Sequence, residues 1–217
     1  MTCDEIYLPD ARAWVQLHPA VFIEAYPPRQ VKSLYFDTLD GDCLDANLIG
    51  ISERRKLRLR WYGDEYTSVE GILELKCRES QVGWKERLPL QGTFDFTTIS
   101  WDRFTQQLRE RVDGQFAIWL SHASQPTLIT SYMREYYETI DHQVRITLDY
   151  NLRAHEQFTF TAPNLVSPAI AENLMVVEVK SDAKLCQRVS NVLSSLPLQV
   201  SRNSKYVNGL MGSVGGL

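Results

Sequence analysis

The sequence predicts an α+β fold in which an antiparallel sheet or barrel is covered by a few helices. Three observations predict it: strand-like segments outnumber helical ones, short turn-rich gaps separate them, and no linker or low-complexity stretch divides the 217 residues. With 44% hydrophobic and 23% charged residues, the composition is that of a globular chain. We therefore expect a single domain over residues 1–217.

Three segments carry apolar residues at helical spacing. In the first, Asp10 can cap a helix whose apolar positions are Trp14, Leu17 and Val21, and Pro27–Pro28 ends that unit. The other two segments run from Trp101 to about Leu120 and from Leu185 to Leu196, where Pro197 closes the last helix.

Strand signals dominate from Val31 onward, with turn residues between the runs. The stretch Asp40–Ser52 is interpreted as a polar connection because it contains two glycines, and Gly212, Gly215 and Gly216 predict a flexible C-terminal end. The expected strands are Ser33–Thr38, Lys56–Tyr62, Ile72–Arg78, Trp84–Leu90, Leu128–Thr139, Val144–Arg153 and Leu174–Lys180.

The expected strands place charged side chains on one face and apolar side chains on the other, because neighbouring residues of a strand point to opposite sides. In KLRLRW, for example, Lys56, Arg58 and Arg60 alternate with Leu57, Leu59 and Trp61. The basic positions are Lys56, Arg58, Arg60, Lys76, Arg78, Lys85, Arg87, Arg134, Arg145 and Lys180, and the acidic ones are Glu74, Asp149 and Glu178.

A solvated polar face is one explanation for any single strand. Basic residues nevertheless predominate in this set although the whole chain has a net charge of −4, and like charges opposite one another destabilise a sheet. A polyanion that neutralises them is therefore the second explanation. If the sheet closed into a barrel with this face inward, it would form a basic tunnel, with the apolar face outward under the helices. The three carboxylates would then pair with the cations or hold a divalent metal.

Several classes of protein are excluded by what the sequence lacks. The net charge of −4 argues against a surface that binds nucleic acid, and no apolar run approaches the roughly 20 residues of a membrane-spanning helix. The N-terminus has no signal-peptide pattern, and the scattered Cys and His residues do not have the spacing of a zinc site. We expect reduced thiols in a cytoplasmic protein. Common nucleotide-binding and hydrolase motifs are absent.

The stretches YPPRQVKSLYFDT, KLRLRWYG, LELK, GWKER, VRITLD, VEVKSD and SKYVNG occur in this order, and together they resemble the VTC domain. This domain is the polyphosphate polymerase module of the vacuolar transporter chaperone complex, within the triphosphate tunnel metalloenzyme (CYTH-like) superfamily. The resemblance covers about Val15 to Gly209, and it depends on the order and spacing of motifs that are individually weak. It implies a closed antiparallel β-barrel, a tunnel lined by Lys, Arg and Glu.

The resemblance also implies an activity, which is transfer of the terminal phosphate of a nucleoside triphosphate to polyphosphate with Mn²⁺ or Mg²⁺. Two alternatives stay open. A tunnel triphosphatase would hydrolyse triphosphate, polyphosphate or nucleotide, and a non-catalytic module would only bind polyphosphate. Nucleic acid is not an expected partner, because a tunnel lined by side chains cannot admit a duplex.

The implied site combines the charged faces with the family's motifs. The resemblance implies a catalytic set of Arg58, Arg60, Lys76, Lys85, Arg87, Arg134 and Arg145. Further substrate-binding residues are Lys56, Arg78, Lys180 and Lys205, and the candidate metal ligands are Glu178 and Glu74.

Each role has an alternative. Glu178 and Glu74 can instead form ion pairs with nearby cations, and Arg134 can be a structural arginine stacked between Tyr132 and Tyr136. Asp149 can orient an arginine, and the aromatic residues are interpreted as core, with none assigned to nucleotide recognition.

One segment departs from the family's pattern. The family begins with a strand of the form R-x-E-x-K-[YF], whereas the corresponding place here reads CDEIYL at Cys3–Leu8 and lacks the lysine. We expect the first tunnel strand to be truncated or degenerate, which favours the binding-only alternative over catalysis.

Overall fold

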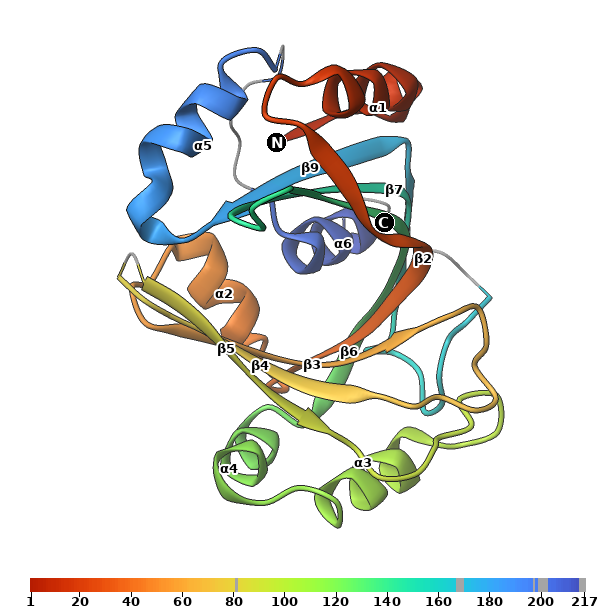
Figure 1. The fold of residues 1–217 in the computed structure, drawn as a ribbon. Helices are drawn as coiled ribbons and strands as arrows, with labels where there is room; N and C mark the ends of the chain where they lie inside the picture. Colours follow the sequence, from red (N-terminus) through yellow and green to blue (C-terminus); the bar gives the residue numbers. More distant parts are fainter. Residues whose placement is uncertain (81, 167–169, 197, 199–202, 215–217) are drawn as a thin grey trace. The chain divides into compact units, whose positions relative to one another are not determined.

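The computed structural model describes residues 1–80, 82–166, 170–196, 198 and 203–214. Its main feature is a nine-stranded sheet with the strand order β1-β9-β7-β6-β2-β3-β4-β5, and β8 pairs with β7 outside this path (Figure 1). The strands are β1 (Thr2–Asp4), β2 (Phe22–Asp37), β3 (Arg54–Tyr62), β4 (Ile72–Glu79), β5 (Val82–Pro89), β6 (Gln125–Thr139), β7 (Val144–Glu156), β8 (Ile170–Glu172) and β9 (Leu174–Ser181).

The helices complete an α+β fold, so the predicted class is confirmed. They are α1 (Leu8–Leu17), α2 (Asp42–Ile49), α3 (Trp101–Arg109), α4 (Gly114–His122), α5 (Cys186–Leu193) and α6 (Lys205–Val214), with 3-10 turns at Glu5–Tyr7 and Ala183–Leu185. Within the part of the chain that the structure describes, no hydrogen-bonded pairing joins β5 to β1, so the sheet is open at these strands and the closed barrel stays a prediction. None of the described helices has the length and apolarity needed to span a membrane.

The chain divides into two compact units. Unit 1 comprises residues 1–30, 132–152 and 171–203, and unit 2 comprises residues 31–131, 153–170 and 204–217. Each unit has its own hydrophobic core, and β2 and β6 each contribute residues to both units.

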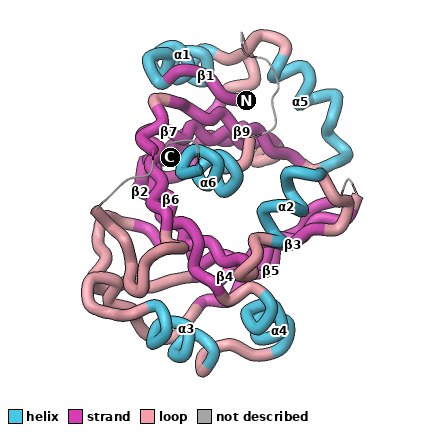
Figure 2. Tube along the Cα trace, turned by 180° about the vertical axis from the view of Figure 1, so that it is seen from behind, coloured by secondary structure: helices cyan, strands magenta, loops and turns pink. Residues whose placement is uncertain are grey.

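In unit 2, the predicted alternation of β3 is confirmed. Leu57, Leu59 and Trp61 are almost fully buried, and they pack in one core with Phe104 of α3 and Leu120 of α4. Figures 1 and 2 show α3 and α4 together on one side of β3–β5. Lys56, Arg58 and Arg60 therefore lie on the face that these helices do not cover, whereas Arg55 lies over the ring of Trp119 in α4.

The predicted helix over residues 101–120 is in fact two helices. α3 ends at Arg109 and α4 begins at Gly114, whose φ of +52° is the left-handed conformation that glycine adopts without strain. This backbone reversal separates Phe104 and Leu108 from Phe116 and Leu120, so both helices can bury their apolar faces in the same core.

In unit 1, the first helix buries a different stripe from the predicted one. α1 begins at Leu8, with a proline in its first turn, and it buries Leu8, Ala11 and Val15 against β7 and β9. Leu17 is 82% exposed and Val21 is 52% exposed, so these two predicted positions were wrong, whereas Trp14 is partly buried against this core. The bounds of the helix explain the error, because Leu8 precedes the expected start at Asp10 and Val21 follows the last helical residue, Leu17.

The sequence suggested that the proline pair ends the N-terminal helical unit, but the structure places the pair inside a strand. Pro27 and Pro28 lie inside β2, ahead of Val31, where the pairing of β2 with β3 begins. Both prolines precede the part of β2 that pairs with β3, so their missing N–H groups remove no hydrogen bond from that pairing.

Two helices were not predicted. α2 lies in the stretch interpreted as a polar connection, and the glycines that suggested a loop are its caps, since Gly41 and Gly50 both have φ of +81°. α6 occupies most of the predicted flexible tail, including Gly212, whereas Gly215 and Gly216 lie outside the described residues, as does Pro197.

Candidate functional site

The face of β2–β5 in unit 2 that α3 and α4 do not cover carries two rows of polar side chains that run across the strands. The strand register aligns Tyr35 with Arg58, Arg58 with Glu74, and Glu74 with Arg87. The next row aligns Lys56, Lys76 and Lys85 on three consecutive strands. The alternation of charged and apolar residues predicted that the charged residues share one face of the sheet. The strand register shows that they lie side by side on it.

Glu74 is the centre of this arrangement. Its side chain is buried, and its Oε2 accepts hydrogen bonds from Arg58 Nε at 2.8 Å and lies 3.8 Å from Arg60 Nη1. Its Oε1 lies 2.8 Å from Lys85 Nζ and 3.2 Å from Arg87 Nε. One carboxylate therefore balances four cations, which is the ion-pair alternative for Glu74.

The cations keep Glu74 ionised, and burial lowers the pKa of two lysines on this face. Burial raises the pKa of Glu74, but Arg58, Arg60 and Lys85 outweigh it and lower the pKa to about 2. Burial lowers the pKa of Lys85 to about 8 although Glu74 opposes the shift. Burial also lowers the pKa of Lys56 to about 8, with neighbouring cations acting in the same direction.

The lysine row concentrates positive charge. Lys56 donates to Ser204 Oγ at 3.0 Å, Lys85 bonds Glu74, and Lys76 between them is exposed. Three ammonium groups aligned on adjacent strands repel one another, and a bound anion would relieve that repulsion. This row favours the polyanion explanation over a merely solvated face.

Arg58 is held from two sides. Glu74 binds its Nε and Nη2, and the hydroxyl of Tyr35 accepts from its Nη1 at 3.2 Å. The guanidinium is fixed before any ligand arrives, which lowers the entropy lost on binding. Sequence reasoning assigned Tyr35 only to the core and missed this second role.

The first residues of α6 form part of the same region. Tyr206 packs against the ring of Tyr35 with centroids 5.1 Å apart, and its hydroxyl donates to the buried Asp37. Asp37 also accepts from the N–H groups of Cys43 and Leu44, so it joins α6 to the start of α2. Sequence analysis assigned no role to Asp37, and the tyrosine that bonds this carboxylate is 169 residues away.

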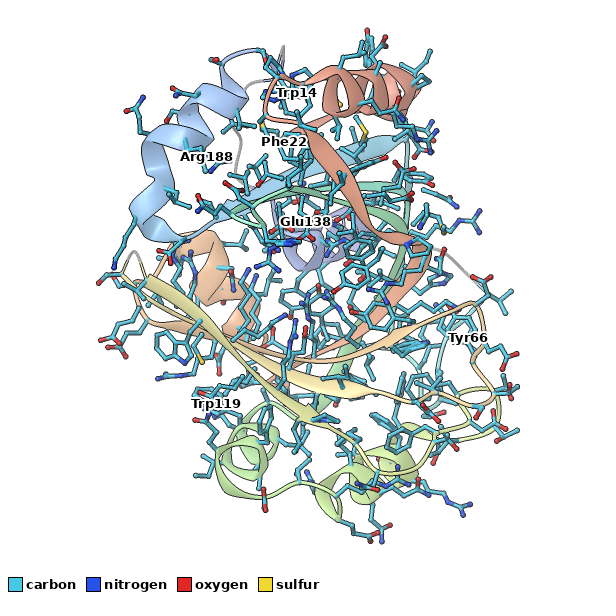
Figure 3. The ribbon with its side chains drawn as sticks, in the orientation of Figure 1. Trp14, Phe22, Tyr66, Trp119, Glu138 and Arg188 are labelled. Carbon is cyan, nitrogen blue, oxygen red and sulfur yellow. The ribbon has the colours of Figure 1, made fainter. Side chains whose placement is uncertain are left out.

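One buried lysine of unit 2 is unrelated to this cluster. Lys32 lies on the apolar face of β2, donates to the carbonyl oxygen of Asp64, and has its Nζ 3.7 Å from the ring centroid of Tyr66, which is labelled in Figure 3. These two contacts indicate that Lys32 has a structural role.

The remaining predicted residues form a separate set in unit 1. Arg134 donates from Nε and Nη2 to the two oxygens of Asp149 at 2.5 and 2.6 Å, so Asp149 does orient an arginine. Arg134 Nη2 also lies 3.7 Å from Glu178 Oε2, which Lys180 Nζ approaches at 3.0 Å. The guanidinium lies over the rings of Tyr132 and Tyr136, as the stacked alternative proposed.

The predicted site residues are thus distributed between the units. Lys205 lies at the start of α6, exposed Arg78 donates to the carbonyl of Ser80, and exposed Arg145 aligns with Lys180. Unit 2 contains Lys56, Arg58, Arg60, Glu74, Lys76, Arg78, Lys85, Arg87 and Lys205, and unit 1 contains Arg134, Arg145, Glu178 and Lys180.

The donor set for a metal is sparse. Among the described residues, no group of three or more His, Cys, Asp or Glu side chains could by itself hold a metal ion. Glu178 is 40% exposed, whereas Glu74 is enclosed by cations. Because Mg²⁺ is usually bound through one or two carboxylates together with substrate phosphates, Glu178 fits a metal that arrives with phosphate.

The first-strand segment serves a local purpose. β1 pairs with β9, and Asp4 Oδ1 caps the following 3-10 turn by accepting from the N–H of Ile6 at 2.9 Å. Glu5 Oε2 accepts from the N–H of Asn151 at 2.8 Å. Both carboxylates are thereby engaged in backbone contacts.

Comparison with known proteins shows the family of the chain and its fold. The model of the VTC domain family matches residues 14–213. The chain belongs to the VTC domain family. No curated protein matches the chain. Fourteen solved chains match it. One is HpAC1 from Hippeastrum, a candidate adenylyl cyclase reported to show a dominant triphosphatase activity, which is 15% identical with a TM-score of 0.51. That match covers 94% of this chain and 91% of HpAC1, and at this identity it shows the triphosphate tunnel fold alone.

Proposed function

We propose that this VTC domain is a metal-dependent polyphosphate polymerase, which transfers the terminal phosphate of a nucleoside triphosphate to polyphosphate. The observation that carries the proposal is the row of Lys56, Lys76 and Lys85 beside Arg58 and Arg87 on the open face of β3–β5. Family membership and the tunnel-fold neighbour support a substrate with several linked phosphates.

The chemistry suits a site made of cations. A terminal oxygen of polyphosphate would attack the γ-phosphorus, the bond from that phosphorus to the β,γ-bridging oxygen would break, and the nucleoside diphosphate would leave. Such a transfer needs in-line positioning and neutralisation of the equatorial oxygens rather than a nucleophilic side chain. Arg58 is suited to this because its planar guanidinium is held by Tyr35 and Glu74.

In unit 1, we propose that Arg134, Arg145 and Lys180 bind phosphate oxygens and that Glu178 holds Mn²⁺ or Mg²⁺. A divalent ion, when bound, would supply positive charge to the phosphate oxygens. Arg134 would stay charged throughout, since Tyr132 and Asp149 raise its pKa despite its burial. The closed tunnel implied by the family is part of this proposal.

A triphosphatase is the second candidate function. HpAC1, which shares the fold, is reported to have a dominant triphosphatase activity, and the same cations would serve attack by water. In that reaction the oxygen of water bonds to the terminal phosphorus and the bond from that phosphorus to the bridging oxygen breaks. Inorganic phosphate and the substrate shortened by one phosphate leave, and a proton passes to the medium.

The products of a single incubation test these candidates. The purified chain would be incubated with ATP, Mn²⁺ and a short polyphosphate primer, with polymer length measured on a gel and free phosphate by colour. Lengthening that disappears in Arg58→Ala and Glu178→Ala supports the polymerase, whereas phosphate without polymer supports the triphosphatase.

The exposed residue Glu79 on β4 provides the matched control, and Glu79→Ala should retain activity. If neither product forms with Mn²⁺ or Mg²⁺ although polyphosphate binds, the binding-only alternative replaces both enzymes.

A further inference from the structure

Tyr26, Arg29 and Tyr136 of unit 1 pack against one another and form a group that we call the aromatic stack. It lies beside Arg134. The rings of Tyr26 on β2 and Tyr136 on β6 meet edge to face, with centroids 5.6 Å apart and an interplanar angle of 82°. The guanidinium of Arg29 lies 5.1 Å from the centroid of Tyr26 and 4.8 Å from that of Tyr136, and its Nε donates to Tyr136 Oη at 3.4 Å.

Tyr26 is held in place although it is 56% exposed. The edge-to-face contact and the guanidinium restrict its ring, and the two prolines that follow restrict its backbone. An exposed aromatic ring that is already ordered loses little conformational entropy when a flat ligand stacks on it. Packing of the protein core does not require this arrangement, because Tyr26 lies outside the core clusters.

The stack lies next to groups that we propose bind phosphate. Arg134 is two residues from Tyr136 on β6, about 7 Å along the strand, and its guanidinium lies 5.9 Å from the centroid of the same ring. Arg134 in turn contacts Glu178, which contacts Lys180. The ring of Tyr136 therefore contacts both Tyr26 of the aromatic stack and Arg134 of the charged group.

We propose that Tyr26, ordered by Arg29 and Tyr136, is the stacking platform for the base of the nucleoside triphosphate. This inference rests on the proposed function. It adds a binding site for the base, which a nucleoside triphosphate has and inorganic triphosphate lacks. Stacking on an aromatic ring accepts every base because each base has a π-face. The platform therefore favours nucleotides over inorganic triphosphate without selecting adenine over guanine.

The test compares ATP with inorganic tripolyphosphate, by calorimetric titration of the full chain. Tyr26→Ala should weaken ATP binding by about 5- to 100-fold, the range expected for loss of one base–aromatic stack. Tripolyphosphate affinity should not change, and GTP should show the same loss as ATP. Tyr26→Phe should retain most of the ATP affinity, because the ring is kept.

Tyr7→Ala is the matched control, because Tyr7 is also 56% exposed and also belongs to unit 1. Equal ATP affinity in Tyr26→Ala and the unmodified chain would overturn the proposal. So would an equal loss of ATP and tripolyphosphate binding, since the role of Tyr26 would then be structural.

A second readout separates this proposal from the proposed function. Stacking on a tyrosine should shift the H2 and H8 proton resonances of AMP upfield in the presence of the unmodified chain, and not with Tyr26→Ala. Failure of the chain to bind tripolyphosphate would refute the proposed function. Intact tripolyphosphate binding with unshifted adenine resonances would refute the platform alone.

Discussion

Glu74→Gln is the perturbation that most directly tests the charge balance of the cationic face. The amide keeps the size of the side chain but removes the charge that Arg58, Arg60, Lys85 and Arg87 share. Buried charges that lose their partner are costly because neither water nor a counter-ion replaces it.

The structure gives the size of the effect. The pKa of Glu74 is lowered from 4.5 to about 2, and at about 1.4 kcal/mol per pKa unit this corresponds to about 3 kcal/mol of folding free energy at neutral pH. This free energy is not reduced for solvent screening, because the side chain of Glu74 is only 2% exposed. Solvent does screen the interaction of Glu74 with Arg87, whose side chain is 60% exposed. For a chain of this length, the melting temperature should fall by about 6–12 °C.

Urea unfolding at pH 7, followed by circular dichroism, would measure this loss, with Glu79→Gln on the same strand as the control. Glu79 is exposed, so its variant should change the free energy of unfolding by less than about 0.5 kcal/mol. Tripolyphosphate should bind Glu74→Gln at least as tightly as the unmodified chain, because the cluster gains net positive charge. A loss below about 1 kcal/mol would refute the charge-balance argument, and weaker anion binding would indicate that Glu74 acts as a metal ligand instead.

Three further predictions follow from the same contacts. Because the pKa of Glu74 is depressed, its stabilisation should be complete above about pH 4.5 and be lost as the pH falls toward 2, and acid unfolding of Glu74→Gln should lack this slope. Burial lowers the pKa of Lys56 to about 8, so tripolyphosphate affinity should fall as the pH rises through 8, and a titration of Lys56→Arg should show a smaller fall; an identical profile would contradict a role for this ammonium. Tyr206→Phe removes a donor to the buried Asp37 and should lower the free energy of unfolding in urea by about 1.5–3 kcal/mol, whereas exposed Tyr7→Phe should not.

The sequence alone determined which residues share a face. In KLRLRW, the period-two alternation predicted that Lys56, Arg58 and Arg60 lie opposite Leu57, Leu59 and Trp61, and the structure confirms this. The order of such segments also identified the family. Both inferences depend on local features, since strand geometry fixes the direction of each side chain from its position in the chain.

The sequence was less informative where a glycine can belong either to a loop or to a helix cap, and where the first residue of a helix was uncertain. Gly41 and Gly50 suggested a loop, yet they cap α2, because left-handed glycines end helices as readily as they form turns. The predicted apolar stripe of the first helix omitted Leu8 because the start was placed near Asp10, and it included Val21, which lies beyond the end of the helix.

Which charges meet depends on how the strands align with one another. The register of β3, β4 and β5 places Glu74 between Arg58 and Arg87, and it aligns Lys56, Lys76 and Lys85. Alternation does not contain this information, because the alignment of two strands depends on the turns and neighbours of both. The pairing of Asp37 with Tyr206, across 169 residues, likewise exists only once α6 has packed against the sheet.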